Sequence, residues 1–298
     1  MKILLIGKSG QVGFEAQRSL APIGEVAAVG YPECDLSQPD SIRRVIRAMQ
    51  PAVIVNAAAY TSVDKAESEA ELATAINAAA PAVIGEEAAR IGARVVHYST
   101  DYVYDGTKTG AYLEDDATNP LSVYGTTKRD GDLALAASGA EHFIFRTSWV
   151  FGAHGANFVK TVLRLAAERD RLNVVGDQIG APTAAALIAD VTAQAIGQTR
   201  FRPAAAIPSG TYHLVAGGET SWHGFAQAII RGAAARGRAL RMAPEAVRAI
   251  TTAEYPLPAG RPANSRLDAS RLSQTFGLVL PDWRSGLDHV LDQLIPLS

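Results

Sequence analysis

The chain has 298 residues, of which 48% are hydrophobic and 19% are charged, and its formal net charge at pH 7 is -2. This length is enough for one large domain or two moderate ones, each with its own core. The near balance of charge gives no compositional case for binding nucleic acid or an anionic membrane surface, so the expected partners are small molecules.

The cysteine count and the apolar runs of the chain predict where the protein is located. The single cysteine, Cys34, has no partner for an intramolecular disulfide, and the six histidines show no paired metal-ligand spacing. The opening apolar run, Ile3 to Ile6, is too short for a signal peptide, and no later run of about 20 apolar residues follows. We therefore expect a cytoplasmic protein without a membrane anchor.

The first predicted element is a strand over 2–6, which leads into a glycine turn and a helix. The turn reads Gly7-Lys8-Ser9-Gly10-Gln11-Val12-Gly13. Gly7 allows a tight turn, Gly10 lets the backbone approach a pyrophosphate, and Gly13 allows the helix to pack closely on the strand. The helix N-terminus adds N–H donors and a positive dipole. A purely structural turn is the alternative, but the position directly after the opening strand favours a dinucleotide site.

The end of the second predicted strand, Glu25 to Val29, bears on coenzyme choice. An acidic residue there would bind the ribose hydroxyls of NAD, and an arginine would accommodate the phosphate of NADP. The sequence at this point is Gly30-Tyr31, which supplies neither group. Asp35 follows later and is better placed to border the adenine, with Lys8 as a candidate phosphate partner. On these residues the coenzyme preference is open.

The third predicted strand, Pro51 to Val55, runs into small side chains at Asn56-Ala57-Ala58-Ala59-Tyr60. Such residues would let a flat ligand lie on the backbone, and tight packing explains them equally well. The helix predicted over 71–80 carries Asn77 on an otherwise alanine-rich surface. Its polar side chain could face the site, but taken alone that asparagine is expected to face solvent.

The fourth predicted strand, Arg94 to Tyr98, ends in Ser99, Thr100 and Asp101. Ligands of doubly wound sheets bind at the carboxyl ends of the strands. By position, either Ser99 or Thr100 could hydrogen-bond a substrate carbonyl oxygen.

Tyr124 and Lys128 lie four residues apart on a helix predicted over 120–138, so their side chains share one face. A phenol titrates near ~10 in water, and a neighbouring cation lowers that pKa towards the range of general acid catalysis. An exposed helical pair is the ordinary reading of this spacing. Together with the glycine turn and the strand-end hydroxyl, the pair favours reduction of a carbonyl by hydride transfer.

The strand predicted over 143–146 ends near Trp149, whose indole could stack on a base or sugar or pack in the core. Beyond it the strand and helix rhythm loosens. We therefore predict a dinucleotide-binding domain over 1–150 and a mainly substrate-binding domain over 151–298, with some segments returning to the first sheet. A late loop carries Arg261 and Arg266, whose charges could bind a diphosphate, and Asn264, which could add orientation. An incidental surface loop is the alternative.

Motifs along nearly the whole chain resemble one enzyme family. They are GKSGQVG, VNAAAYTSVDKAE, VVHYSTDYVYDG, YGTTK, FRTSWVFG, DQIGAPT, YHLVAGG and RPANSRLD. The chain resembles the dTDP-4-dehydrorhamnose reductases, which are extended short-chain dehydrogenases/reductases. The resemblance implies an α/β fold with a Rossmann-type doubly wound parallel sheet and a smaller C-terminal α/β substrate domain. It also implies NAD(P)H-dependent reduction of the C4 ketone of dTDP-4-dehydro-β-L-rhamnose to dTDP-β-L-rhamnose, the last step of dTDP-L-rhamnose biosynthesis.

The resemblance assigns roles to residues. Tyr124 would donate the proton, Lys128 would bind the nicotinamide ribose and lower the tyrosine pKa, and Thr100 would hold the substrate oxygen. NADPH is the expected coenzyme, with NADH also accepted. The cofactor would contact Gly7, Gly10, Gln11, Val12, Gly13, Asp35, Leu36, Ala59, Tyr60, Thr61, Tyr124 and Lys128. The substrate would contact Thr100, Asp101, Trp149, Asn157, Arg261 and Asn264.

One departure from the family bears on assembly. Some members hold a divalent metal between subunits through carboxylates. Glu15 is retained here, but Ala184-Ala185-Ala186 stands where such members have a glutamate. We therefore expect no metal, and a monomer or weak homodimer.

Three other functions stay open on the sequence: reduction of another 4-keto nucleotide-sugar, epimerisation of one, and a non-catalytic regulatory role. The last is disfavoured because Thr100, Tyr124 and Lys128 are all intact.

Overall fold

A computed structural model describes residues 1–295, so residues 296–298 of the predicted second domain lie outside the described residues. Its centre is a six-stranded parallel sheet in the order β10-β5-β4-β3-β1-β2. The strands are β1 (Lys2–Ile6), β2 (Glu25–Val29), β3 (Val53–Asn56), β4 (Arg94–Thr100), β5 (His142–Thr147) and β10 (Gly210–His213). This confirms the predicted Rossmann-type doubly wound fold.

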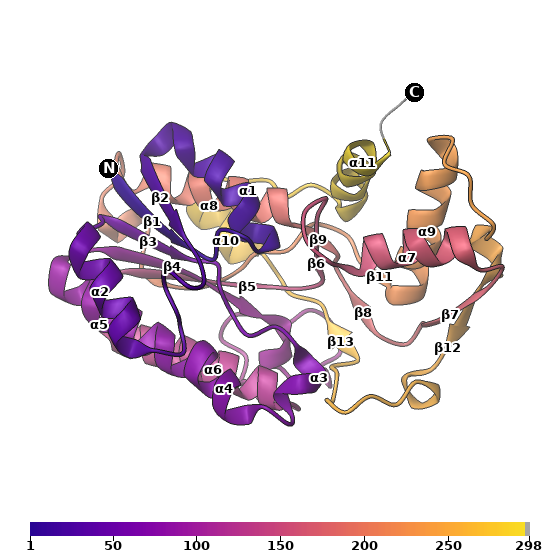
Figure 1. Ribbon diagram of the computed structural model, residues 1–298, viewed down its shortest axis with the longest axis horizontal. Coiled ribbons are helices and arrows are strands. Elements are labelled where there is room, and N and C mark those ends of the chain that lie inside the picture. The colour runs from indigo at the N-terminus through magenta and orange to yellow at the C-terminus, as the bar shows by residue number, and fades with distance from the viewer. Residues whose placement is uncertain (296–298) are drawn as a thin grey trace.

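Helices cover both faces of this sheet (Figure 1). One face carries α2 (Pro39–Met49), α5 (Ala80–Ile91) and α6 (Val123–Ala137), and the other carries α1 (Gln11–Leu20), α8 (Ala185–Gln198) and α10 (Ser270–Phe276). Strand β1 shows why: Ile3 and Leu5 point into the core under α1 and α8, whereas Leu4 and Ile6 point into the core under α2 and α5. A strand buried on both faces is apolar at successive positions instead of alternating.

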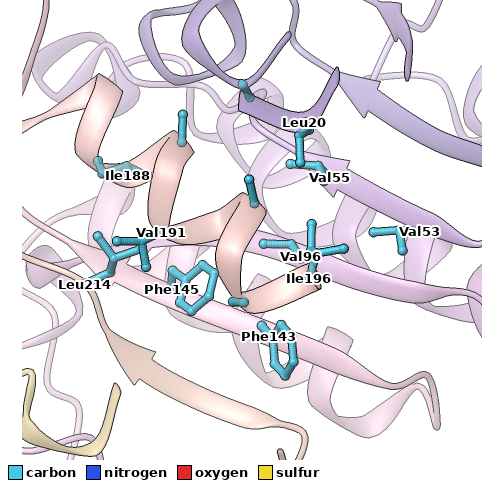
Figure 2. Packing of buried hydrophobic residues seen from close by; sticks show 14 of the residues in the cluster. Leu20, Val53, Val55, Val96, Phe143, Phe145, Ile188, Val191, Ile196 and Leu214 are labelled. Carbon is cyan, nitrogen blue, oxygen red and sulfur yellow. The ribbon is translucent and has the colours of Figure 1, made fainter. Parts of the chain in front are cut away.

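The core beneath α8 is built from aliphatic and aromatic side chains of the strands and the helices (Figure 2). Val96 of β4 and Phe145 of β5 face Ile188 and Val191 of α8. Tyr212 of β10 joins the same cluster, so chain segments from beyond residue 180 complete the first core. This packing holds the carboxyl ends of the strands rigidly in place.

A second core lies beside the sheet, on the right of Figure 1. Phe151, Phe225, Ile229, Trp283 and Leu291 are among its buried residues. Its helices are α7 (Phe158–Glu168), α9 (Trp222–Ala235) and α11 (Trp283–Leu294). Its short strands are β6 (Val150–Phe151), β7 (Leu172–Val175), β8 (Ile179–Gly180), β9 (Thr183–Ala184), β11 (Thr220–Ser221), β12 (Val247–Ile250) and β13 (Asn264–Ser265).

The strand order reverses between β1 and β3. The chain leaves β1 for β2 on one side and returns to β3 on the other, which opens a crevice at the carboxyl ends of β1 and β3. Gly7 follows β1 and Ala58 follows β3, and they are so close that a Cβ atom on Gly7 would lie 2.7 Å from the Ala58 nitrogen. The fold thus places the glycine turn at the expected ligand crevice.

The helix predicted over 71–80 differs from what is observed. It begins as α4 (Ala70–Thr74), passes through a π-helical turn (Ala75–Ala79) and continues directly as α5 to Ile91. Pro81 follows the wider π turn, where its missing N–H and its ring are accommodated without ending the helix. Within residues 1–295, no helix combines the length and the apolarity that crossing a membrane requires.

Candidate active site

The N-terminus of α6 is fixed against the loop after β4. Ser122 caps the helix by accepting a hydrogen bond from the Gly125 N–H at 3.1 Å, and the Val123 N–H donates to Glu67 at 2.9 Å. A Cβ atom on Gly125 would lie 2.2 Å from the Tyr102 carbonyl oxygen. Only glycine allows this approach, which brings Tyr124 to the end of β4.

Thr100 ends β4 and caps the 3₁₀ turn η3 (Asp101–Val103). Its oxygen accepts from the Tyr102 N–H at 3.2 Å, and its hydroxyl donates to Asp101 Oδ1 at 3.0 Å. The same hydroxyl lies close enough to the phenol of Tyr124 to act against the rise in the pKa of that phenol. The predicted neighbourhood of a strand-end hydroxyl and the helical tyrosine is therefore present, and it is Thr100, not Ser99, that supplies the hydroxyl, because Ser99 donates to Asp132 at 2.7 Å.

Asp101 is buried, and its Oδ2 has no hydrogen-bond partner among the described residues. Burial raises the pKa of this carboxyl to about 6. A buried oxygen without a partner beside the Thr100 and Tyr124 hydroxyls marks a place where a polar ligand group can bind.

Lys128 differs from the expectation. Its Nζ donates to the Tyr98 carbonyl at 2.7 Å and lies 3.1 Å from Nε2 of His97, behind the phenol. Burial raises the pKa of Tyr124, and Lys128 is not among the groups that shift it. Loss of hydration thus dominates the pKa of Tyr124 in this arrangement, and the role of Lys128 towards the tyrosine stays a prediction.

The glycine turn has the geometry of a phosphate loop. Gly7 has φ +94°, and a Cβ atom on Gly13 would lie 2.0 Å from the Gly7 carbonyl oxygen. These two positions need glycine for the turn and for the close contact of α1 with β1. A Cβ atom on Gly10, by contrast, would meet nothing closer than 3.5 Å, so the space over Gly10 is open at the helix N-terminus. Gln11 and Val12 follow as the first residues of α1.

The loop Ala59-Tyr60-Thr61 after β3 is held by Asn77. The Asn77 side chain accepts from the Tyr60 N–H at 2.9 Å and donates to the Tyr60 carbonyl at 3.0 Å and to the Thr127 hydroxyl at 3.2 Å. The expectation that Asn77 faces solvent is wrong, because its side chain ties this loop to α6 from a buried position. The sequence gives no periodic signal for such a bridge.

An acidic group does reach the end of β2. Glu33 accepts from the Gly30 N–H at 3.1 Å and from Lys8 Nζ at 2.7 Å, because the turn closed by the Cys34 N–H to Gly30 carbonyl bond folds it back. The conclusion that this strand end has no acidic residue is therefore wrong. Asp35, the residue expected near the adenine, uses Oδ1 to accept from the N–H and hydroxyl of Ser37. The Leu36 side chain is buried in the core beneath α2.

A cavity of 650 Å³ separates the end of β4 from the second core. Tyr102, which packs edge-on against Tyr124 with ring centroids 5.4 Å apart, is on its wall. Arg261 also lines it and is paired with both carboxylate oxygens of Asp64, at 3.1 and 2.8 Å. Trp222 lines the cavity and stacks on Trp149 at 3.8 Å. The sequence reading singled out Trp149 and missed Trp222, whose position at the start of a helix gave no signal.

Two predicted substrate contacts have scaffold roles. Asn157 caps α7 by accepting from the Lys160 N–H, and its amide donates to Gln11 at 2.9 Å and to the Gly152 carbonyl at 2.7 Å. Asn264 donates to the carbonyls of Lys108 and Gly110 and accepts twice from Arg266. Both donors of each amide are used within the protein, so each side chain has a scaffold role, and direct substrate contact by Asn157 and Asn264 stays a prediction.

Comparison with known proteins places the chain in context. The family model described as "RmlD substrate binding domain" matches residues 1–295. A dTDP-4-dehydrorhamnose reductase of Burkholderia thailandensis is 48% identical over 95% of this chain and 96% of its own length. One from Shigella flexneri is 48% identical over 99% of this chain and 98% of its own length.

Solved structures of dTDP-4-dehydrorhamnose reductases are also similar to this chain over nearly its full length. A dTDP-4-dehydrorhamnose reductase of Clostridium acetobutylicum superposes with a TM-score of 0.90 at 35% identity, covering 99% of both chains. One from Bacillus anthracis, solved in complex with NADP, has a TM-score of 0.88 at 32% identity and covers 98% of this chain and 99% of its own.

Proposed function

We propose that this chain, which belongs to the RmlD substrate binding domain family, reduces the C4 ketone of dTDP-4-dehydro-β-L-rhamnose to give dTDP-β-L-rhamnose. NADPH is the coenzyme. The observation that carries the proposal is the neighbourhood of the Thr100 hydroxyl and the Tyr124 phenol at the carboxyl end of β4, where Tyr124 packs on Tyr102 of the cavity wall. Relatives with this named activity share 48% of their residues with the chain over nearly its full length.

The residues at the strand ends fit a dinucleotide. The open space over Gly10 and the N-terminus of α1 suit a pyrophosphate, and the Ala59 to Thr61 loop borders the same crevice. NADPH, when bound, supplies the hydride that reduces the ketone carbon. The protein's own task is then to hold the ketone and to deliver a proton to its oxygen.

Burial gives Tyr124 the protonation state that this task needs. Its raised pKa keeps the phenol protonated at neutral pH, so it can donate as negative charge develops on the ketone oxygen. The Thr100 hydroxyl, which lies next to the phenol, orients that oxygen. The cavity lined by Tyr102, Arg261 and Trp222 is large enough for the nucleotide end of the substrate.

The direct test is the fall in absorbance of the reduced nicotinamide when the protein meets dTDP-4-dehydro-6-deoxy-L-mannose. Rapid loss is expected with NADPH, and a parallel run with NADH measures the preference. A protein that binds NADPH and leaves the absorbance unchanged would refute the assignment. Conversion of the sugar without net oxidation of the coenzyme would indicate an epimerase instead.

Glu33 and Lys8 should set the coenzyme preference. The Glu33 carboxylate holds the Lys8 ammonium at 2.7 Å, beside the place where the adenosine ribose binds. In Glu33→Gln the ammonium is no longer neutralised, so we expect the ratio of kcat/KM for NADPH over NADH to rise a few-fold, the size expected for an exposed ion pair. Glu25→Gln, which removes an exposed carboxylate at the opposite end of β2, is the control. An unchanged ratio in Glu33→Gln would contradict this role.

The finer features of the protein belong to the same proposal. We assign residues 1–150 to the dinucleotide-binding domain and those that follow mainly to the substrate domain, which is supported by the two separate cores. We place the protein in the cytoplasm as a monomer or weak homodimer.

A further inference from the structure

The loop between β6 and α7, residues 152–157, reaches from the second core to the glycine turn. His154 in this loop stacks on Phe14 of α1, with ring centroids 4.1 Å apart and planes 5° apart. Its Nε2 lies 3.0 Å from the carbonyl oxygen of Ser9, which can only accept, so this ring nitrogen carries a proton. The loop is therefore fastened to the turn on which the coenzyme pyrophosphate is expected to lie.

The side-chain amide of Asn157, at the end of this loop, has one possible orientation. Its Oδ1 accepts from the Lys160 N–H at 3.2 Å, as the cap of α7. Its Nδ2 lies 2.7 Å from the Gly152 carbonyl oxygen and 2.9 Å from Oε1 of Gln11. A backbone N–H can only donate and a carbonyl can only accept, so both ends of the amide are fixed. Asn157 is thus a donor towards Gln11.

This donor also sets the orientation of the Gln11 amide. Because Oε1 faces Asn157, the NH₂ group of Gln11 faces away from it and has no acceptor among residues 1–295. Gly155 passes close by, since a Cβ atom on it would lie 3.1 Å from Cγ of Gln11. Gln11 is the first residue of α1, and Gly10 caps this helix without a side chain. The NH₂ group and the first N–H groups of α1 are all donors, which suits a pyrophosphate because it offers only acceptors.

We propose that Asn157 is a positioning residue for the coenzyme, which holds Oε1 of Gln11 so that the NH₂ group of Gln11 donates to the pyrophosphate of NADPH. This role rests on the proposed function, which supplies the identity of the coenzyme. The two residues are 146 positions apart in the sequence, so a residue at the start of the second core controls a donor at the start of the first.

Asn157→Asp reverses the Gln11 amide without removing the cap of α7. Aspartate caps helices about as well as asparagine does, so α7 should stay in place. Its carboxylate can only accept, so Gln11 turns its NH₂ group towards it and presents Oε1 to the pyrophosphate. Two acceptors repel each other. We therefore expect the Kd of NADPH, measured by fluorescence titration, to rise about 10- to 100-fold, as for the loss of a hydrogen bond to a charged group.

A double-mutant cycle with Gln11→Ala separates this effect from the added charge. Gln11→Ala alone should raise the Kd of NADPH about tenfold, and an unchanged Kd would overturn the proposal. In the Gln11→Ala background, Asn157→Asp should raise the Kd by no more than about twofold, because the amide that it turns is absent. Equal losses in both backgrounds would show that the carboxylate acts through its charge, against the proposal.

Asn157→Ser gives an uncharged version of the same test. Serine also caps helices, but it does not offer Gln11 the fixed amide donor. The Gln11 amide is then free to turn, so we expect the Kd of NADPH to rise about three- to tenfold in the Gln11 background and to stay unchanged in the Gln11→Ala background. The same rise in both backgrounds would contradict a role that acts through Gln11.

Fragments of the coenzyme localise the effect. 2′-Phospho-ADP-ribose contains the pyrophosphate, whereas adenosine 2′-phosphate does not. In Asn157→Asp the affinity for the first should fall as it does for NADPH, and the affinity for the second should stay at the wild-type value. Equal losses for both fragments would show general disruption of the adenosine site and would overturn the proposal.

Gln227→Glu is the matched control. It replaces another amide that donates to a backbone carbonyl, that of Pro244 at 3.2 Å, and it adds the same charge among the helices of the second core. Its Kd for NADPH should equal that of the wild type. A rise as large as in Asn157→Asp would show that any such charge weakens coenzyme binding.

Binding of thymidine diphosphate distinguishes positioning of the coenzyme from contact with the substrate. In Asn157→Asp we expect its Kd to stay within about twofold of the wild type, because α7 keeps its cap. Weaker binding of thymidine diphosphate with unchanged binding of NADPH would make Asn157 a substrate contact and overturn the proposal. A wild-type protein that binds NADPH and reduces no ketone would refute only the proposed function, whereas one that binds no NADPH would refute both.

Discussion

Replacing Tyr124 with Phe is expected to lower kcat about 10²- to 10⁴-fold, the usual contribution of a positioned general acid. The substitution removes only the phenolic oxygen. The ring keeps its edge-on contact with Tyr102 at 5.4 Å, so the wall of the cavity is unchanged. Without the phenol, the ketone oxygen must take its proton from water, which is not held in place for the transfer.

The same variant should bind NADPH as the wild type does, within a few-fold in Kd. The glycine turn and the Ala59 to Thr61 loop are held by Gly13 and by Asn77, and neither contact involves the Tyr124 hydroxyl. Fluorescence titration of NADPH and steady-state rates on one preparation separate the two effects. Much weaker NADPH binding together with an unchanged kcat would show that the tyrosine serves binding instead of catalysis.

Tyr98→Phe is the control for this experiment. Tyr98 lies on β4, close to the site in sequence, and its hydroxyl pairs with Thr192 in the core beneath α8. Removing that hydroxyl should leave kcat within a few-fold of the wild type, although it costs some stability because Thr192 loses its partner. Comparable losses in both variants would point to general disruption of β4, and not to chemistry at Tyr124.

The parts of the fold that the sequence predicted are those with a local signal. The continuous apolar runs of β1 and β3 follow from burial on both faces, and the glycines at 7 and 13 follow from contacts that no side chain could enter. The spacing of Tyr124 and Lys128 is likewise a property of one helix. These features needed no knowledge of distant residues.

What the sequence could not predict depends on pairing between distant segments. Glu33 reaches the end of β2 only because a turn folds it back onto Gly30. Asn264 appeared free to bind substrate, yet the carbonyls of Lys108 and Gly110, more than 150 residues earlier, take both of its donors. Lys128 turns to His97 because α6 packs on the face of the sheet from which the His97 side chain projects. An isolated motif does not say which partners its polar groups will find.

Gly131 brings α6 into close backbone contact with the π turn of the preceding helix. A Cβ atom on Gly131 would lie 2.0 Å from the Asn77 carbonyl oxygen and 3.2 Å from Pro81 Cγ. Gly131 is inside α6, where alanine normally adds about 1 kcal/mol of stability. Here the new methyl group must push the two helices apart, and overpacking of this kind costs about 1–3 kcal/mol or more.

We therefore expect Gly131→Ala to lower the free energy of unfolding by about 2 kcal/mol, since the backbone clash outweighs the gain in helix propensity. It should also weaken NADPH binding, because the same movement displaces Asn77, which holds both the Tyr60 loop and Thr127. Urea denaturation measures the first effect, and titration with NADPH the second.

Gly197→Ala separates the clash from the general effect of removing a helical glycine. Gly197 is inside α8, and a Cβ atom there would meet only Ile23 Cγ2, at an ordinary 3.9 Å. This variant should be as stable as the wild type or more stable by up to about 1 kcal/mol. If Gly131→Ala behaved like Gly197→Ala, the close contact between α6 and the π turn would not exist in solution, and the geometry that places Tyr124 would need another explanation. If the two substitutions change the stability in opposite directions, the difference comes from the surroundings of each glycine. For Gly131 these surroundings are the contact with Asn77 that positions α6 and Tyr124.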